Sequence, residues 1–129
     1  MPILFAFVLM VVAVLAAPAL ADPPKDIDHY LCYRVTAYDG PAGIQVKLQD
    51  QFGQMVAHAA KPALLCNPVD KNGEGIQDPA AHLLCYSLTD VEDDPGERKV
   101  VTETQFGKTT LTVEGMRNLC LPASKQLAR

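Results

Sequence analysis

The chain has 129 residues, a formal net charge of −4 and four cysteines, and 49% of its residues are hydrophobic. A chain of this length suits one domain with its own core. An acidic chain without a basic patch is repelled by phosphate backbones, so this composition disfavours nucleic-acid binding.

Residues 1–21 have the layout of a secretory signal peptide. An apolar run is followed by the helix-breaking Pro18 and by the small residues Ala19 and Ala21, which form a small-x-small cleavage site. The same run is about long enough to span a bilayer, so an uncleaved anchor is the alternative, and no Lys or Arg precedes the run. Pro18 and the small residues favour cleavage. We therefore expect a mature chain of residues 22–129, secreted or periplasmic, with no membrane span.

The mature chain contains an internal repeat. Three short motifs occur twice in the same order, and the copies are 53 positions apart for the first motif and 54 for the other two. The paired segments are residues 29–33 and 82–86, 51–53 and 105–107, and 65–68 and 119–122. This spacing defines repeat 1 as about 28–71 and repeat 2 as about 82–125. A unit of about fifty residues buries little surface by itself, so we expect both repeats to form a single β domain.

Both repeats show strand patterns. Apolar residues alternate with polar ones over residues 44–49 and 110–113, as in strands with one buried face. Segments 29–33 and 82–86 are apolar on both faces and predict central strands. The glycine that ends each second motif stands where a chain reversal needs a positive φ. The sequence thus predicts an all-β fold, in which two pseudo-symmetric units pack about a pseudo-twofold axis into one small disulfide-bonded sandwich or barrel.

Each repeat carries two cysteines: Cys32 and Cys66 in the first, Cys85 and Cys120 in the second. An even number of cysteines in an exported chain favours disulfides over free thiols. Three pairings are possible, and the repeat symmetry permits all of them. We favour Cys32–Cys66 and Cys85–Cys120, because the unit that duplicated would already have been closed by its own bridge.

The segment between the repeats matches part of a calcium loop. Oxygen-bearing residues occupy loop positions one, three, five and nine, with glycine at position six, a spacing that lets several oxygens converge on Ca²⁺. The candidate ligands are Asp70, Asn72, Glu74 and Asp78. Position twelve is Ala81 instead of glutamate, and no helices are predicted on either side. A solvated turn explains the same residues, and both interpretations stay open at this point.

The paired HxLCY, QFG and LCxP elements, together with residues 67–76, resemble an uncharacterised family of exported bacterial domains. The resemblance covers about residues 28–125. It implies a β-rich fold and a bacterial extracytoplasmic setting, and it implies no activity, substrate or partner. Leu121 stands where repeat 1 has Asn67, so any role of that asparagine is not duplicated.

These patterns predict a non-enzymatic secreted module that binds an unidentified protein or surface ligand and needs no cofactor. One alternative is a small extracytoplasmic hydrolase with a carboxylate-based site, which a pocket enclosing carboxylates from both repeats would favour. Another is a calcium-stabilised structural element of a cell-surface assembly.

Overall fold

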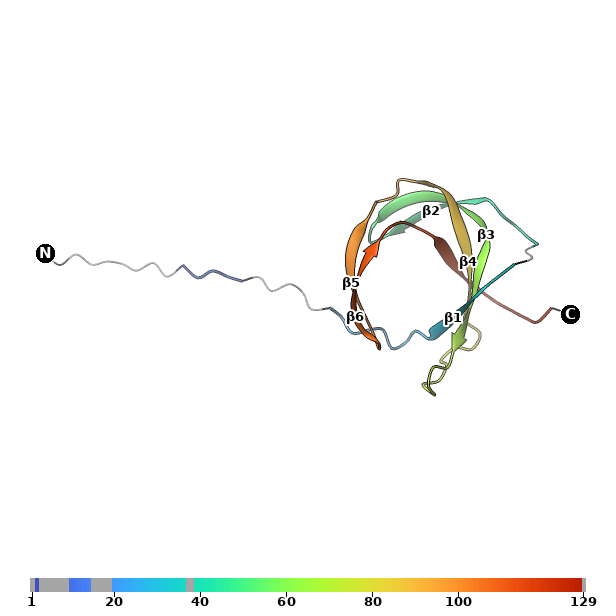
Figure 1. The fold of residues 1–129 in the computed structure, drawn as a ribbon, viewed down its shortest axis with the longest axis horizontal. Helices are drawn as coiled ribbons and strands as arrows, with labels where there is room; N and C mark the ends of the chain where they lie inside the picture. Colours follow the sequence, from blue (N-terminus) through green and yellow to red (C-terminus); the bar gives the residue numbers. More distant parts are fainter. Residues whose placement is uncertain (1, 3–9, 15–19, 37–38, 129) are drawn as a thin grey trace.

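The computed structural model describes the chain except for residues 1, 3–9, 15–19, 37–38 and 129 (Figure 1). The described part contains seven strands and no helix, which confirms the predicted all-β class. The strands are β1 (His29–Arg34), β2 (Ile44–Asp50), β3 (Gly53–Val69), β4 (His82–Glu92), β5 (Arg98–Thr104), β6 (Gly107–Val113) and β7 (Asn118–Ala123). Much of the predicted signal segment, residues 1–21, lies outside the described residues. Among those that are described, none belongs to a helix long and apolar enough to cross a membrane.

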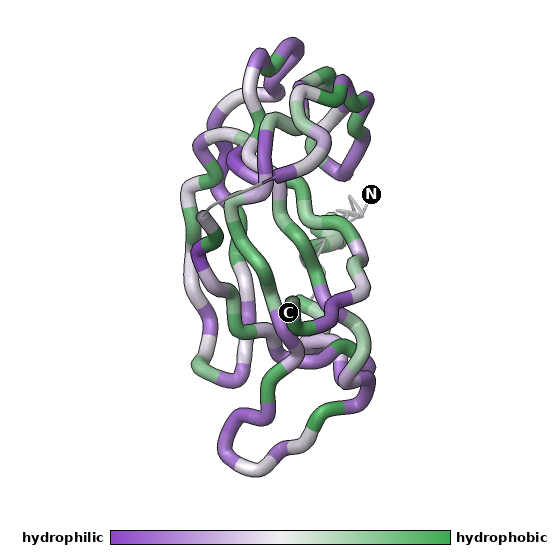
Figure 2. The backbone as a smooth tube through the Cα atoms, turned by 90° about the vertical axis from the view of Figure 1, so that its right-hand side faces the viewer, coloured by the Kyte–Doolittle hydropathy of each residue, from purple (hydrophilic) through white to green (hydrophobic). Residues whose placement is uncertain are grey.

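The strands form two sheets that curve around a common centre (Figure 1). The larger sheet has five strands in the order β1-β3-β4-β7, with β2 also paired to β3, and the smaller sheet is the β5–β6 hairpin. Strand β3 is long enough for two successive partners, because its first half pairs with β2 and its second half with β1. Hydrophobic residues concentrate along the strands, and hydrophilic residues in the loops at both ends (Figure 2).

The two repeats are related by a step of two strands along the large sheet. Strands β1 and β4 are both antiparallel to β3, so they run in the same direction. Backbone hydrogen bonds recur with the repeat offset: Val35 N–H donates to the Ala63 carbonyl (3.2 Å), and Leu88 N–H donates to the Arg117 carbonyl (3.0 Å). The two units thus follow the same strand order as pseudo-symmetric copies of one motif, because the connection after β3 returns directly into the neighbouring antiparallel strand.

Only one of the two HxLCY segments lies in the middle of the sheet. The second segment begins β4, which is flanked by β3 and β7, as predicted. The first segment forms β1, which pairs with β3 alone among the described strands. The prediction of a central strand for residues 29–33 is therefore wrong.

The core is small and is built from β3 and β4. Its buried hydrophobic residues, within the described part of the chain, are Met55, Ala57, Ala59, Cys66 and Cys85. Two of these five residues are disulfide-bonded cysteines. Covalent bridges thus occupy space that large apolar side chains fill in better-packed domains.

The QFG motif forms the turn of each hairpin. The Phe52 N–H donates to the Asp50 carboxylate (2.8 Å), and the Phe106 N–H donates to the Thr104 hydroxyl (3.1 Å). Such side-chain bonds close short turns by imitating a backbone turn. The glycine that follows has φ of 146° at Gly53 and 116° at Gly107, as the sequence predicts, since side chains with a Cβ rarely adopt this region.

Candidate functional site

The two disulfides form a row across the large sheet. Cys32 is bonded to Cys66 and Cys85 to Cys120, so each bridge lies within one repeat. In both cases the bonded residues stand directly opposite each other on neighbouring antiparallel strands. The sulfurs of Cys66 and Cys85 are 3.9 Å apart across the β3–β4 pair. All four cysteines therefore point to the same face of the sheet.

The opposite face of these strands is apolar. Because successive side chains in a strand alternate between faces, the neighbours of each cysteine point away from the sulfur row. We call this surface the apolar face; it comprises Leu31, Tyr33, Leu65, Leu84, Tyr86, Leu119 and Leu121. The opposed pairs Tyr33–Leu65, Leu65–Leu84 and Leu84–Leu121 continue across all four strands.

Exposure on the apolar face increases toward its two edges. Leu31 and Tyr33 on β1 are 46% and 50% exposed, and Leu121 on β7 is also exposed. Leu84 and Tyr86 on the central strand β4 are partly covered. The sequence analysis missed this surface. The signal was present in the residues that flank each cysteine, but alternation alone does not show which face is covered.

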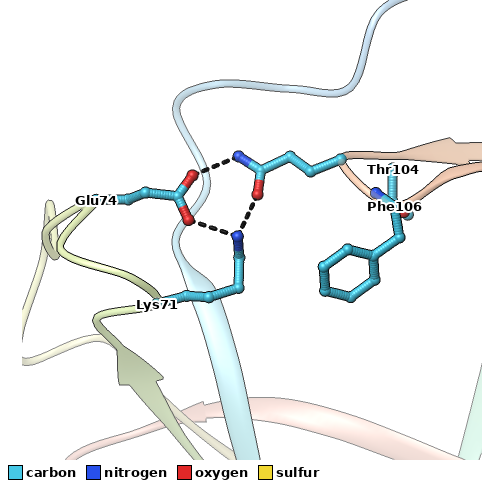
Figure 3. Close-up of polar contacts among 5 residues, drawn as sticks. Lys71, Glu74, Thr104 and Phe106 are labelled. Atoms are coloured by element: carbon cyan, nitrogen blue, oxygen red, sulfur yellow. Dashed lines mark hydrogen bonds and ion pairs between the residues drawn. The ribbon is translucent and has the colours of Figure 1, made fainter.

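A polar cluster joins the β5–β6 hairpin to the segment between the repeats (Figure 3). The Lys71 ammonium lies 2.5 Å from the Glu74 carboxylate and donates to the Gln105 side-chain carbonyl at 2.5 Å. The Gln105 amide donates to the other Glu74 oxygen at 2.6 Å. The hydrogen bonds from Lys71 and then Gln105 lower the pKa of Glu74. Lys71 also lies 5.6 Å from the centre of the Phe106 ring. This cluster fixes the position of the hairpin turn.

Asp28 holds the other end of the same segment. Its carboxylate accepts the backbone N–H groups of Gln77 (2.7 Å) and Asp78 (2.9 Å). These two bonds lower the pKa of Asp28, because they stabilise its charged form. A residue just before β1 thus organises the connection that leads into β4.

Two of the four predicted calcium ligands bind protein groups. Glu74 pairs with Lys71 and Gln105, and the Asp78 carboxylate accepts the Ala80 N–H (3.1 Å). Asp70 is exposed, and Asn72 has a φ of 57°. Within the described ranges, no three His, Cys, Asp or Glu side chains are grouped so that they could hold a metal ion. Calcium binding stays a prediction from the spacing alone.

An open groove of about 620 Å³ lies beside the cluster and contains carboxylates from both repeats. They are Asp28 just before β1, Glu74 in the segment between the repeats, and Glu103 on β5. A glycoside-cleaving general acid needs a raised pKa, because it must hold its proton near neutral pH. The pKa values of Asp28 and Glu74 are both lowered. These two groups suit structural anions better than proton donors.

The comparison with known protein families agrees with the repeat architecture. The family described as "Repeat of unknown function (DUF7450)" matches residues 5–122. The chain belongs to this family. No curated protein and no solved structure matches the chain. Family membership therefore supports the duplicated, uncharacterised domain that the motifs indicate, and it assigns no activity.

Replacing Gln105 by alanine is expected to loosen the β5–β6 hairpin. The variant loses both side-chain bonds that join the turn to Lys71 and Glu74. Amide hydrogen exchange over residues 98–113 should become faster than in the parent protein. The control is Gln51→Ala, because Gln51 is the repeat counterpart in the β2–β3 turn. Equal exchange in the two variants would contradict the role assigned to Gln105.

Asp28 is expected to stabilise the fold in a pH-dependent way. Its folded pKa lies below the ordinary value of 3.8, so its contribution is present above that pH and is lost as pH falls through the folded pKa. The difference in unfolding free energy between the parent protein and Asp28→Ala should be largest near neutral pH and shrink below pH 3.8. Urea titrations at several pH values measure it. A constant difference, or the same profile for the exposed Asp26→Ala, would argue against this role.

If the connecting segment binds calcium, the ion should stabilise the folded state by mass action. The thermal midpoint of the oxidised protein in excess calcium should then exceed the midpoint in EDTA by several degrees. An Asp70→Ala variant should abolish the difference. Identical midpoints in calcium and EDTA would remove calcium from consideration.

Proposed function

We propose that the mature protein is a non-enzymatic extracytoplasmic interaction module. Its contact surface is the β1 edge of the large sheet together with the adjoining part of the apolar face. The partner is a protein that adds an extended strand along β1, so that backbone hydrogen bonds supply affinity and the apolar face supplies specificity. The supporting observation is the exposure of Leu31 and Tyr33 on an edge strand.

The comparison between the two repeats supports this assignment. Leu84 and Tyr86 are the repeat counterparts of Leu31 and Tyr33 and are partly covered within the sheet. The same side chains on β1 are left exposed, although an unpaired strand edge with apolar side chains favours association. We expect an exposed apolar edge strand of this kind to be kept in a protein when another protein binds to it.

An extracytoplasmic location is supported by the two disulfides and by the apolar segment at the start of the chain. Disulfides persist in oxidising compartments such as the periplasm or the medium. The resemblance of the motifs to exported bacterial domains is the support for a bacterial origin. The hydrolase alternative has the groove with Asp28, Glu74 and Glu103 in its favour, but Asp28 and Glu74 already accept hydrogen bonds from Gln77, Asp78 and Gln105.

Photo-crosslinking from position 33 tests the proposed function. A benzophenone amino acid replaces Tyr33, the protein is expressed with its native export segment, and irradiated cells are searched for covalent adducts. We expect adducts that form at position 33 and disappear when excess unmodified protein competes. The adduct is identified by mass spectrometry, whatever protein it contains.

The matched control places the same photo-reactive group at Phe106, an exposed aromatic residue at the tip of the β5–β6 hairpin. Adducts that are equally abundant from both positions would show non-specific capture. An absence of adducts from position 33 under conditions where the protein is folded and oxidised would reject the proposed function.

A further inference from the structure

The β3–β4 seam joins the last strand of repeat 1 to the first strand of repeat 2. Its opposed pairs are Leu64–Cys85, Leu65–Leu84 and Cys66–Leu83. Because the repeats differ by a step along the sheet, both halves of this seam occur a second time in the chain. Strand β7 repeats the second half of β3, and β1 repeats the start of β4. Among the described strands, β1 and β7 each have one partner and form the ends of the sheet order.

Burial differs sharply between the seam and its two unpaired copies. Cys66 and Cys85 at the seam are 2% and 1% exposed. Their counterparts Cys120 on β7 and Cys32 on β1 are both exposed. The residues and the disulfides are the same, so the difference arises from the second neighbouring strand, which neither β1 nor β7 has among the described residues.

The hairpins show the same difference. Ala57, in the first half of β3, is 0% exposed, whereas its repeat counterpart Leu111 on β6 is 43% exposed. The β3 residue is flanked by β2 and by the extension of β4, to which Val56 and Ala59 pair. Strand β6 pairs with β5 alone within the described residues. In repeat 1, strand β3 is covered by β4 of repeat 2. The counterparts of β3 in repeat 2, β6 and β7, have no such cover among the described strands.

We propose that copies of this chain associate head to tail, with β7 of one copy added antiparallel to β1 of the next. This inference rests on the proposed function and names the partner as a second copy. The alignment follows from the β3–β4 register. Residues of β3 are replaced by those 54 positions later in β7, and residues of β4 by those 53 positions earlier in β1. It places Asn118 opposite Cys32 of the next copy, Leu119 opposite Leu31, and Cys120 opposite Tyr30.

Proline positions agree with this alignment. Pro122 lacks an N–H group and lies two residues beyond Cys120, outside the aligned stretch. Its counterpart Pro68 likewise lies beyond Cys66–Leu83, the last pair of the β3–β4 seam. The proline thus has the same position relative to the paired residues in β7 of the proposed contact as in β3 of the observed seam.

The proposed contact is heterologous, because it joins two different edges. Unless it closes into a ring, an assembly built by such a heterologous contact leaves one β1 edge and one β7 edge exposed at its ends. The average mass should therefore rise continuously with concentration and should not stop at a closed dimer.

A charge-pairing experiment tests the register. Two double variants differ only at position 119: Leu31→Lys/Leu119→Lys places like charges opposite each other between copies, and Leu31→Lys/Leu119→Glu places opposite charges there. Like charges directly across a strand pair are destabilising, and opposite charges are stabilising. Sedimentation velocity of the full oxidised protein over a wide concentration range measures the association. Ile44→Lys, on the exposed edge strand β2, is the control for added charge.

We expect self-association of the parent protein and of Ile44→Lys, and at least about tenfold weaker association of Leu31→Lys/Leu119→Lys. The Leu31→Lys/Leu119→Glu variant should regain association, more strongly at low salt. Thermal melts of the monomers at low concentration should show that both double variants fold.

Three outcomes would overturn the inference: a parent protein that stays monomeric, two double variants that associate equally, or a closed dimer that neither pair affects. The proposed function fails separately. If photo-crosslinks from position 33 contain another protein while the parent chain is monomeric, head-to-tail pairing is wrong and the interaction module stands. If position 33 gives no adduct, both proposals fall.

Discussion

Reduction of both disulfides is expected to unfold the domain near room temperature. The bridges close segments with sequence separations of 34 and 35 residues. Each should contribute about 3–4 kcal/mol by limiting the unfolded chain, against a typical net stability of about 5–15 kcal/mol. Cys66 and Cys85 are also part of the small buried core, so separating each sulfur from its bonded partner additionally disturbs the packing there.

Urea unfolding followed by circular dichroism, with and without a phosphine reductant, measures this effect. The Cys32→Ser/Cys66→Ser variant keeps one bridge and should unfold at an intermediate urea concentration. Cys85→Ser/Cys120→Ser in repeat 2 is its matched counterpart. A reduced protein with the same unfolding midpoint as the oxidised protein would show that packing alone maintains the fold.

Substitution of Ala57 by arginine is expected to prevent folding. Ala57 lies on β3 opposite Val46 of β2 and is fully buried. An arginine there must bury an unpaired charge, which costs several kcal/mol, and overpacks the site by about 1–3 kcal/mol more. The sum is comparable with the whole stability of a domain of this size.

The matched control is Leu111→Arg, at the counterpart position on β6. This side chain is half exposed, so the monomer should lose no more than about 0.5 kcal/mol. The yield of soluble oxidised protein and its melting curve compare the two variants at low concentration. Similar behaviour of both would mean that the repeats are equally covered in solution, in contradiction to the burial difference between β3 and β6.

Local patterns were sufficient for the strands and turns. Residues 44–49 alternate with period two and form β2, and each QFG glycine adopts a positive φ. These features depend on a few neighbouring residues, so composition and spacing predict them. The calcium-loop spacing is equally local, yet the structure turns Glu74 toward Lys71 and Gln105. Gln105 belongs to repeat 2, and a local sequence pattern cannot predict a contact between residues so far apart in the sequence.

The relation between the repeats could not be predicted from the motifs. The motifs give the order and the spacing of the repeats, but they do not show which strands lie side by side. The structure places β4 beside β3 as its antiparallel partner, so the two repeats share one sheet. The motifs also left the disulfide pairing open, because the repeat symmetry permits all three pairings. Direct opposition of Cys32 and Cys66, and of Cys85 and Cys120, provides its geometric reason.

The amino-acid sequence by itself determined the all-β class, the duplication and the positions of the hairpin turns. Each of these follows from residue periodicity or from the conformational preference of glycine. Only the tertiary structure decided that β1 and β7 are sheet edges and that their apolar side chains are exposed. Identical motifs are buried in one repeat and uncovered in the other, because burial depends on which strand lies alongside and not on the residues themselves.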